Sequence, residues 1–203
     1  EDMLDRPYHL RYELIEFAVF LLAARCQRLT PLHAACVGRD GRGVLVLGAS
    51  GTGKSTLALH CLLQGLDFLS EDAVFVQPDA LLATGVANFL HVQADTLASV
   101  DDPAIRDWIA GSPVITRRSG AAKFEVDLRM APVPVRLAPT PMQLVAAVTL
   151  AGDAATPAAS LLEPVRTESI ADVLAVDQAY AMSQPGWARF ASSFAAAGIH
   201  RLV

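Results

Sequence analysis

The residues with the clearest chemical meaning run from Gly48 to Ser55, in the order Gly-Ala-Ser-Gly-Thr-Gly-Lys-Ser. This segment matches the pattern G-x-x-x-x-G-K-[ST], in which the glycines let the backbone curl so that its N–H groups point at phosphate oxygens. We expect the Lys54 ammonium to reach the β- and γ-phosphates of a nucleotide, and the Ser55 hydroxyl to bind Mg²⁺. The predicted nucleotide-binding residues are Gly48, Ser50, Gly51, Thr52, Gly53, Lys54, Ser55 and Thr56.

Two adjacent carboxylates, Glu71 and Asp72, follow this phosphate loop by one predicted helix and one predicted strand. A phosphoryl-transfer site needs a carboxylate near the metal, and often a second one that orients or deprotonates the acceptor hydroxyl. Neighbouring residues of a strand point to opposite faces, so the two can share a site only where the strand bends. The alternative interpretation is a solvated acidic turn.

A few other polar residues are weaker candidates. His33 lies on a predicted apolar strand, where a lone histidine is more often a core residue than a functional one. Arg117, Arg118 and Lys123 form a positive cluster that could stabilise charge on a transferring phosphoryl group or could be ordinary surface. The remaining histidines have no metal-like spacing, so we expect no zinc site.

The first third of the chain supplies the elements that must position these residues. Apolar residues at helical spacing predict an amphipathic helix over 8–27 that packs on the elements after it in the chain. The residues of this apolar face are Leu10, Leu14, Phe17, Ala18, Leu21, Leu22 and Cys26. Strands are predicted at Leu32–Val37 and Gly43–Leu47, joined as a β-hairpin by the turn at Asp40-Gly41. A helix from Thr56 to Leu63 then ends at Gly65. Further strands are predicted at Leu66–Ser70 and Ala73–Val76.

The rest of the chain has a weaker pattern. Residues 79–118 predict an irregular stretch that acts as a lid or substrate-binding region, although Asp102-Pro103 predicts the start of a helix running through Trp108. The other predicted elements are an edge strand at Lys123–Leu128, a buried strand at Gln143–Leu150, a surface loop at Ala151–Ala159, and closing helices at Thr167–Met182 and Trp187–Ala197. We therefore expect a single α/β domain over 1–203, with a nucleotide-binding core at 30–77, a lid region at 79–120, and C-terminal strands and helices at 121–203.

Composition excludes several classes of protein. The 203 residues are 53% hydrophobic and 18% charged, with a formal net charge of −5, so the chain has ample core material and no basic field that would attract nucleic acid or anionic lipid. The longest apolar run is far shorter than the roughly 20 residues that span a membrane, and the acidic N-terminus does not resemble a secretory signal. Cys26, Cys36 and Cys61 are interpreted as reduced and mostly buried thiols. We expect a cytoplasmic protein.

A group of these residues resembles a known family. His33-Ala34-Ala35, the Asp40-Gly41 hairpin, the phosphate loop, Gly65 and Leu69-Ser70-Glu71-Asp72 together resemble the catalytic domain of HPr serine kinase/phosphorylase, whose P-loop is similar to that of phosphoenolpyruvate carboxykinase. The resemblance is strongest over about residues 30–77. Here a Glu71-Asp72 pair stands where the family has two aspartates, and the family's N-terminal domain and its phosphorolysis segment are not found. The chain is also similar to compact HPr-kinase-related proteins such as lasso-peptide kinases.

The resemblance implies a mixed sheet with a β-hairpin before the phosphate loop and flanking helices, together with ATP, Mg²⁺ and transfer of phosphate to a serine hydroxyl of a peptide or small protein. It implies that Lys54 and Ser55 contact phosphate and metal, that Asp72 is the general base, that Glu71 lies near the metal, and that His33 lies beside the acceptor. Two alternatives stay open, namely a carboxykinase-like small-molecule kinase and a non-catalytic ATP sensor. The identity of the acceptor, ATP against GTP, the reverse reaction and the oligomeric state, including a homo-oligomer, also stay open.

Overall fold

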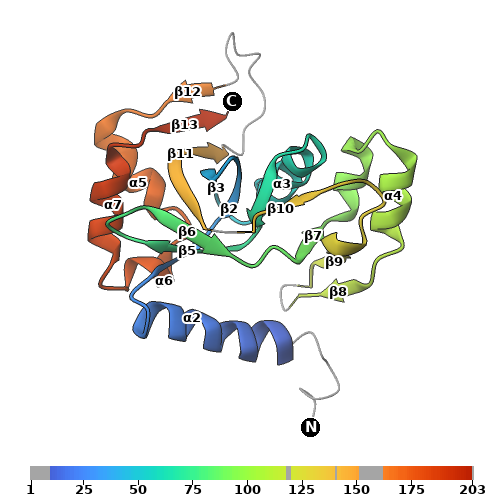
Figure 1. The fold of residues 1–203 in the computed structure, drawn as a ribbon, viewed down its shortest axis with the longest axis horizontal. Helices are drawn as coiled ribbons and strands as arrows, with labels where there is room; N and C mark the ends of the chain where they lie inside the picture. Colours follow the sequence, from blue (N-terminus) through green and yellow to red (C-terminus); the bar gives the residue numbers. More distant parts are fainter. Residues whose placement is uncertain (1–9, 118–119, 140, 151–161, 203) are drawn as a thin grey trace.

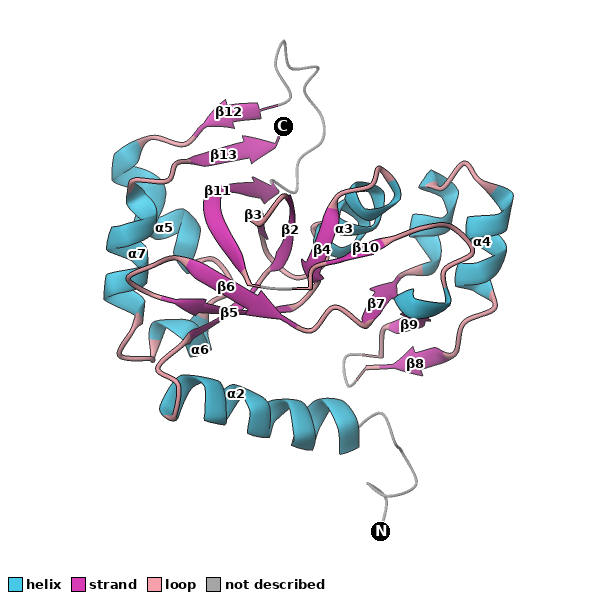
Figure 2. Ribbon diagram, in the orientation of Figure 1, coloured by secondary structure: helices cyan, strands magenta, loops and turns pink. Residues whose placement is uncertain are grey.

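A large mixed sheet and a small antiparallel sheet form the framework of the molecule (Figures 1 and 2). The computed structural model describes residues 10–117, 120–139, 141–150 and 162–202. The strands of the large sheet are β1 (Thr30–His33), β2 (Ala35–Arg39), β3 (Arg42–Leu47), β4 (Asp67–Ser70), β5 (Ala73–Gln77), β6 (Leu82–Gly85), β10 (Arg136–Leu137), β11 (Met142–Leu150), β12 (Leu162–Pro164) and β13 (Ile199–Leu202). The predicted α/β class with a mixed sheet is confirmed.

Strand β3, which leads into the phosphate loop, lies between an antiparallel and a parallel neighbour. On one side it pairs antiparallel with β2, and on the other it pairs parallel with β11. The two residues joining β2 to β3, Asp40 and Gly41, have φ values of 52° and 73°. Positive φ at both central residues is the backbone that a two-residue hairpin favours, because its twist matches that of the strands.

The first strand differs from its predicted extent. The expected single strand Leu32–Val37 is divided at Ala34, whose N–H donates to the carbonyl of Asp72 at 3.2 Å. Residues before this point form β1, which pairs antiparallel with β5, whereas residues after it form β2. His33 therefore ends a strand at the edge of the sheet, next to the residues that connect β4 to β5.

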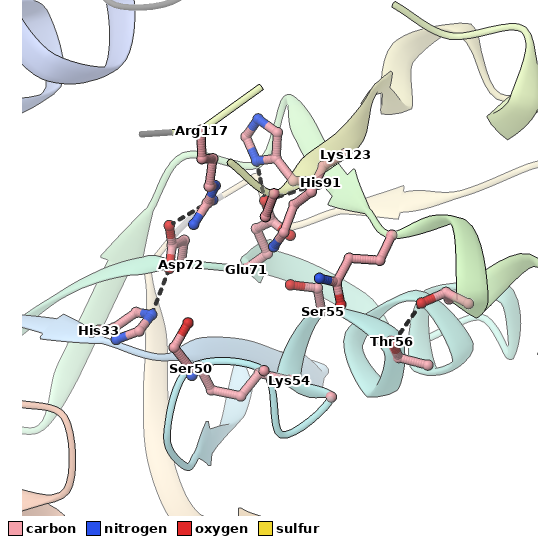
Figure 3. A pocket seen from close by; sticks show the side chains of 15 residues that line it. His33, Ser50, Lys54, Ser55, Thr56, Glu71, Asp72, His91, Arg117 and Lys123 are labelled. Carbon is pink, nitrogen blue, oxygen red and sulfur yellow. Dashed lines mark hydrogen bonds and ion pairs between the residues drawn. The ribbon is translucent and has the colours of Figure 1, made fainter. Parts of the chain in front are cut away.

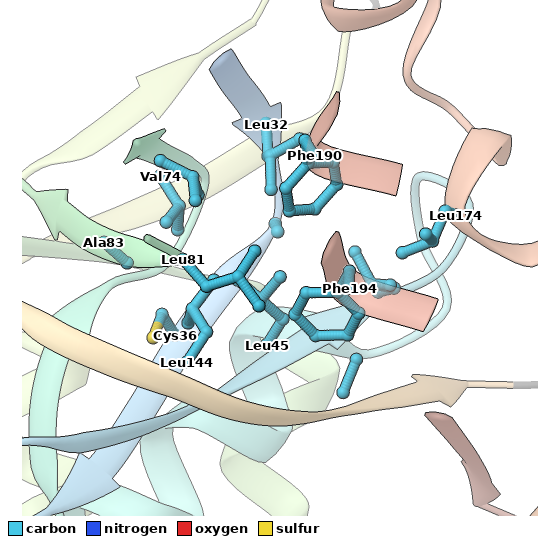
Figure 4. Close-up of a cluster of buried hydrophobic side chains, with 14 of the residues drawn as sticks. Leu32, Cys36, Leu45, Val74, Leu81, Ala83, Leu144, Leu174, Phe190 and Phe194 are labelled. Carbon is cyan, nitrogen blue, oxygen red and sulfur yellow. The ribbon is translucent and has the colours of Figure 1, made fainter. Parts of the chain in front are cut away.

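The two faces of the large sheet are covered by different elements. Successive residues of β3 point to opposite faces, so Leu45 and Leu47 belong to one core cluster and Val46 to the other. The cluster of Leu45 includes Leu174 of α5 (Ile170–Ala175) and Phe190 and Phe194 of α7 (Trp187–Ala195) (Figure 4). The cluster of Val46 includes α3 (Lys54–Leu63), α4 (Pro103–Ala110) and the small sheet.

Residues 79–118, expected to be an irregular lid, contain mostly regular structure. They form β6, β7 (Phe89–Val92), the 3₁₀ helix η2 (Ala94–Ser99), α4 and β8 (Val114–Thr116). Asp102 caps α4 as predicted, with its side chain accepting from Ala104 N at 2.8 Å. The expected edge strand is β9 (Ala122–Asp127), and it lies in the centre of the small sheet because β7 and β8 pair with its two sides.

The predicted helix Thr167–Met182 is divided into three short pieces: the 3₁₀ helix η4 (Thr167–Ser169), α5 and α6 (Ala179–Met182). The chain turns between α5 and α6 at Asp177, which has a left-handed φ of 58°. An α-helix cannot pass through that conformation. The predicted loop at Ala151–Ala159, which connects β11 to β12 in the chain, lies outside the described residues.

The N-terminal helix packs through a different face from the predicted one. It begins as a π-helix, η1 (Leu10–Ile15), continues as α2 (Glu16–Arg25), and lies along one side of the molecule near α6 (Figure 1). Ala23 and Ala24 are buried, whereas Phe17 is 53% exposed and Leu22 is 59% exposed. The expected burial of the Leu10, Leu14, Phe17, Ala18, Leu21, Leu22 and Cys26 face was therefore wrong, because this face turns largely away from the sheet.

Two expectations drawn from composition concern the burial of the cysteines and the lack of a membrane-spanning segment. Cys36 is buried and Cys61 is half-buried, but Cys26 is exposed, so the expectation of mostly buried thiols holds only in part. None of the helices in the part of the chain that the structure describes has the length and apolar content needed to cross a bilayer.

Candidate active site

The phosphate loop forms where β3 ends and α3 begins. Gly48 has a φ of 143°, and a Cβ atom at this position would lie 2.7 Å from the Thr52 hydroxyl oxygen. That hydroxyl donates to the carbonyl of Ala49 at 2.8 Å, which ties the two sides of the loop together. Gly53, with a φ of 97°, immediately precedes α3. The loop therefore has an internal fixed shape that requires glycine at its first position.

Lys54 is buried at the start of α3 and folds back over its own loop. Its Nζ atom donates to the carbonyl oxygens of Gly48 at 2.8 Å and of Ala49 at 3.1 Å. Burial lowers the pKa of Lys54, while the negative charges of Asp72 and Asp177 oppose that shift. The ammonium thus donates to backbone carbonyls of the loop, and these are weaker partners for it than phosphate oxygens.

Glu71 and Asp72 lie in the short connection between β4 and β5, where the chain leaves the regular strand. Both therefore line the same pocket, which regular strand alternation would forbid. Glu71 is buried, and its Oε1 accepts hydrogen bonds from the backbone N–H of His91, at 2.8 Å, and from the His91 ring Nδ1. Its Oε2 is also buried and has no hydrogen-bond partner among the described residues.

Asp72 is held between two cationic side chains. Its Oδ1 lies 2.8 Å from His33 Nε2, and its Oδ2 lies 3.4 Å from Arg117 Nη2. Burial by itself raises the pKa of Asp72, but the hydrogen bond from His33 and the charges of His33 and Arg117 outweigh burial and lower this pKa well below its usual range. Asp72 is consequently an ionised carboxylate at neutral pH.

His33 is fixed by residues from the distant turn between α5 and α6. Its Nδ1 lies 2.9 Å from Asp177 Oδ2, so each ring nitrogen faces a carboxylate. The buried Gln178 side chain accepts from the His33 backbone N–H at 2.9 Å and donates to the His33 carbonyl at 2.8 Å. The hydrogen bond with Asp72 raises the pKa of His33 against the opposing effect of burial. The arrangement favours the imidazolium form.

These residues surround one pocket of about 160 Å³ (Figure 3). The phosphate loop contributes one wall, and the opposite wall comes from Arg117, directly after β8, and Lys123 in β9. Burial lowers the pKa of Lys123, and the neighbouring charge of Arg117 adds to this effect. The predicted residues that line the pocket are His33, Ser50, Gly51, Gly53, Lys54, Ser55, Thr56, Glu71, Asp72, Arg117 and Lys123.

Some predicted residues have other places. Gly48 and Thr52 contact each other within the loop and do not line the pocket. Thr56 lines the pocket and also joins α3 to η2, because its hydroxyl is 2.9 Å from the Thr96 hydroxyl. Arg118 lies outside the described residues.

Sequence reasoning missed three residues that hold the site together: His91, Asp177 and Gln178. In the sequence His91 is one of the histidines without metal-like spacing, and its position in the segment Phe89–Val92 does not indicate its bond to Glu71. Asp177 and Gln178 follow His33 by more than a hundred residues, and no local pattern connects them. The described residues contain no cluster of three or more histidine, cysteine, aspartate or glutamate side chains that could hold a metal alone.

Comparison with known proteins gives one partial sequence match and a low structural similarity. No family model matches the chain. The HPr kinase/phosphorylase of Geobacter sulfurreducens is 33% identical over 86 residues, which are 41% of this chain and 27% of that protein. The chain thus matches about a quarter of the length of this curated relative. The structure of the Hpr(Ser) kinase/phosphatase from Coxiella burnetii matches with a TM-score of 0.34 and 13% identity, covering 66% of this chain and 70% of that one. The sequence match confirms the predicted resemblance of this chain to the HPr kinase/phosphorylase family.

Proposed function

We propose that this protein is an ATP- and Mg²⁺-dependent kinase that transfers the γ-phosphate to a serine hydroxyl of a peptide or small protein. The observation that carries the proposal is the position of Asp72, an ionised carboxylate that opens into the same pocket as Lys54 and the phosphate loop. A nucleotide-binding sensor needs the loop but does not need a carboxylate paired with a histidine beside it. The partial match to an HPr kinase/phosphorylase supports the same reaction class, and the hairpin β2–β3 before the loop is what the resemblance to that family's core implies.

The phosphate loop would hold the triphosphate. Backbone N–H groups between Gly48 and Ser55 and the N-terminal end of α3 would face the phosphate oxygens. Lys54 would exchange its two loop carbonyls for β- and γ-phosphate oxygens, which form stronger charge-assisted hydrogen bonds. Arg117 and Lys123 on the opposite wall would contact the γ-phosphate and spread its charge.

Ser55 and Glu71 fit a Mg²⁺ ion that is coordinated mainly by phosphate and water. Magnesium is usually held by one or two protein oxygens together with substrate phosphates. Glu71 and Ser55 line the same pocket, and the buried Oε2 of Glu71 has no hydrogen-bond partner among the described residues. When bound, the metal neutralises charge on the β- and γ-phosphates.

Asp72 would serve the acceptor side of the reaction. The serine oxygen forms a bond to the γ-phosphorus while the bond from that phosphorus to the β–γ bridging oxygen breaks, and ADP leaves. The serine proton passes to the Asp72 carboxylate. In a loose transition state the attacking oxygen carries little positive charge until late in the reaction, so a carboxylate with a lowered pKa is a sufficient base. His33 keeps that carboxylate ionised and oriented.

The test is transfer of phosphate to a pool of serine peptides from Mg²⁺-ATP, followed by intact mass. We expect the wild-type protein to label serine. Lys54→Ala should lower the rate on the order of 10²–10³-fold, and Asp72→Asn should lower it roughly 10²–10⁴-fold with little change in ATP affinity. The matched control is Asp172→Asn, an exposed carboxylate on α5, which should label at the wild-type rate. Wild-type labelling by Asp72→Asn, or no labelling by the wild-type protein, overturns the proposal.

A further inference from the structure

Two hollows lie beneath the N-terminal helix and meet at Asp72. The first, of about 530 Å³, is bounded by Phe17 and Phe20 of α2 and by Tyr180 of α6. The second, of about 280 Å³, lies on the other side of Glu16, between α2 and β5. Glu16, Asp72 and Ala73 line both hollows. We call the two together the α2 trough.

The first hollow connects the trough with the phosphate loop. Besides its aromatic wall it is lined by Ser50, His33 and Arg117, three residues that also line the phosphate pocket. The phosphates of a nucleotide would fill the phosphate pocket from the loop side, so an acceptor hydroxyl would have to reach Asp72 from the trough. An acceptor in the trough would then approach the γ-phosphate from the side away from the phosphate loop, as in-line attack requires.

The walls of the trough are apolar on both sides of this central point. Phe17 lines the first hollow and is 53% exposed, and Val86 lines the second and is 56% exposed. Both hollows also contain Asp72. The Phe20 ring packs edge-on against Phe75 at 5.0 Å and Tyr180 at 6.2 Å. These ring contacts make the aromatic wall a fixed surface rather than a loose one.

The size and chemistry of the trough favour an extended chain as its occupant. Ligand pockets for drug-sized molecules occupy about 300–1,000 Å³, and the two hollows together fall within this range, so the trough has room for several side chains. A small phosphorylated metabolite needs several convergent polar groups, whereas large apolar side chains form much of the wall of each hollow, together with Arg11 and Asn88 in the second. An extended peptide with apolar side chains on either side of a hydroxyl would match these walls.

On the basis of the kinase activity proposed above, we propose that the α2 trough binds a peptide segment that carries apolar side chains on both sides of the phosphorylated serine. Phe17, Phe20 and Tyr180 would receive the side chain on one side, and Ile15, Val19 and Val86 the side chain on the other. Glu16 and Asp72 at the centre place two carboxylates beside the serine. Acidic side chains at the flanking positions are disfavoured because the apolar walls would remove them from water.

The proposal is tested with a library of nonapeptides that contain a single central serine. Each flanking position is fixed in turn as Leu, Gly or Asp, and labelling from Mg²⁺-ATP is measured. For the wild-type protein we expect Leu to be preferred over Gly by about 10-fold in at least one position on each side, and Asp to be rejected. The readout is the Leu-to-Gly ratio within each protein, which does not depend on the overall activity of a variant.

Two variants separate the two hollows. Phe17→Ser should abolish the preference for Leu on one side of the serine, and Val86→Ser should abolish it on the other side. The matched control is Leu22→Ser, which removes an equally exposed apolar side chain of α2 that lines neither hollow, and it should keep both preferences.

Two results overturn the inference and can be told apart. Labelling of serine with no preference for Leu, or the same loss in Leu22→Ser as in Phe17→Ser, leaves the kinase activity in place and removes the trough as the acceptor site. Absence of any serine labelling by the wild-type protein overturns the proposed kinase activity, and the assignment of the trough falls with it.

Discussion

At Asp72, two cationic groups lie close to one carboxylate, and they do not contribute equally. His33 is 2.8 Å away, whereas Arg117 is 3.4 Å away. Asp177 holds the second nitrogen of the imidazole, so His33 can neither rotate nor lose its proton without breaking an ion pair. The ionisation of Asp72 therefore depends mainly on a histidine that is itself stabilised as a cation from the opposite side.

His33→Gln is expected to move the acidic limb of the pH profile of kcat/KM to higher pH. The variant removes the cation that lowers the pKa of Asp72, and a neighbouring opposite charge is worth about 1–3 pKa units to a carboxylate. At a given acidic pH, more of the variant would carry a protonated Asp72 that cannot accept the serine proton. The profile should be measured from pH 4 to 9 with the same serine peptide for both proteins. If the acidic limb lies at the same pH in both proteins, Arg117 rather than His33 is the main cause of the lowered pKa of Asp72.

His91→Leu is expected to raise the Mg²⁺ concentration needed for the half-maximal rate on the order of 10-fold. The His91 ring fixes Oε1 of Glu71 and so directs Oε2, and residues that orient a metal ligand typically affect metal affinity by 10–100-fold. His91→Asn keeps a donor and should change this concentration less. Direct titration with Mn²⁺ by electron paramagnetic resonance gives a second measurement that does not depend on turnover. A Mn²⁺ affinity of His91→Leu equal to that of the wild-type protein would contradict a positioning role for the ring.

Among the structural elements, the phosphate loop has the strictest backbone requirement. Gly48→Ala should lower the free energy of unfolding by roughly 1–3 kcal/mol and weaken nucleotide binding, because alanine must adopt a φ of 143° with its Cβ close to Thr52. The control Gly41→Asn replaces a glycine whose φ of 73° asparagine tolerates and whose Cβ would meet nothing within 4 Å. Thermal unfolding and calorimetric titration with ATP measure the two effects. A Gly48→Ala protein with unchanged ATP affinity would show that the loop can adapt.

The helix α2 should respond to pH through Glu16. Burial, and then the charge of Asp72, raises the pKa of Glu16 from 4.5 to about 7. Between these values the folded protein binds more protons than the unfolded chain, so stability contributed at this site falls as the pH rises. At pH 8 the free energy of unfolding of Glu16→Gln should therefore exceed that of the wild-type protein by at most roughly 3 kcal/mol, with a higher unfolding temperature, and at pH 4 the two should differ little. Glu168→Gln, an exposed carboxylate, is the control and should give no such pH-dependent difference.

Elements governed by local chemistry could be predicted from the sequence. The Asp40-Gly41 turn, the cap of α4 at Asp102 and the end of α3 near Gly65 all follow from the conformational preferences of one or two residues. The break at Ala34 could not be predicted, because the backbone of Asp72 causes it. The central position of β9 was missed for a similar reason, since β7 and β8 supply its neighbours.

The candidate site shows the same limit. The phosphate loop and the pair Glu71-Asp72 are consecutive in the sequence and could be recognised there. The residues that hold them come from distant segments of the chain. The Gln178 side chain forms hydrogen bonds with the backbone of His33, and the backbone N–H of His91 donates to Glu71. The apolar spacing of the N-terminal helix was recognised correctly, but spacing alone did not show which side faces the sheet, because both sides of α2 carry large apolar residues.

At the scale of the whole molecule, the candidate site is assembled from segments that lie far apart in the chain. The phosphate loop and Asp72 come from the first half, Arg117 follows β8 and Lys123 lies in β9 of the small sheet, and Asp177 precedes α6. Together with His33 and Gln178 these residues span 33–178, so no shorter contiguous fragment contains the whole site. A fragment ending before α5 would keep the loop but lose both partners of His33 from the turn at Asp177.

Strand β3 carries the phosphate loop, but one of its two neighbours, β11, comes about a hundred residues later in the chain. A ribosome adds roughly 5–20 residues per second, so the growing chain spends roughly 5–20 s with β3 paired on one side only. During that interval the free edge of β3 is open to wrong partners, and the loop has no completed sheet beneath it. Nascent chains should therefore begin to bind nucleotide only after β11 has emerged from the ribosome. The phosphate loop in the first third of the chain would then depend on a strand from the last third for nucleotide binding.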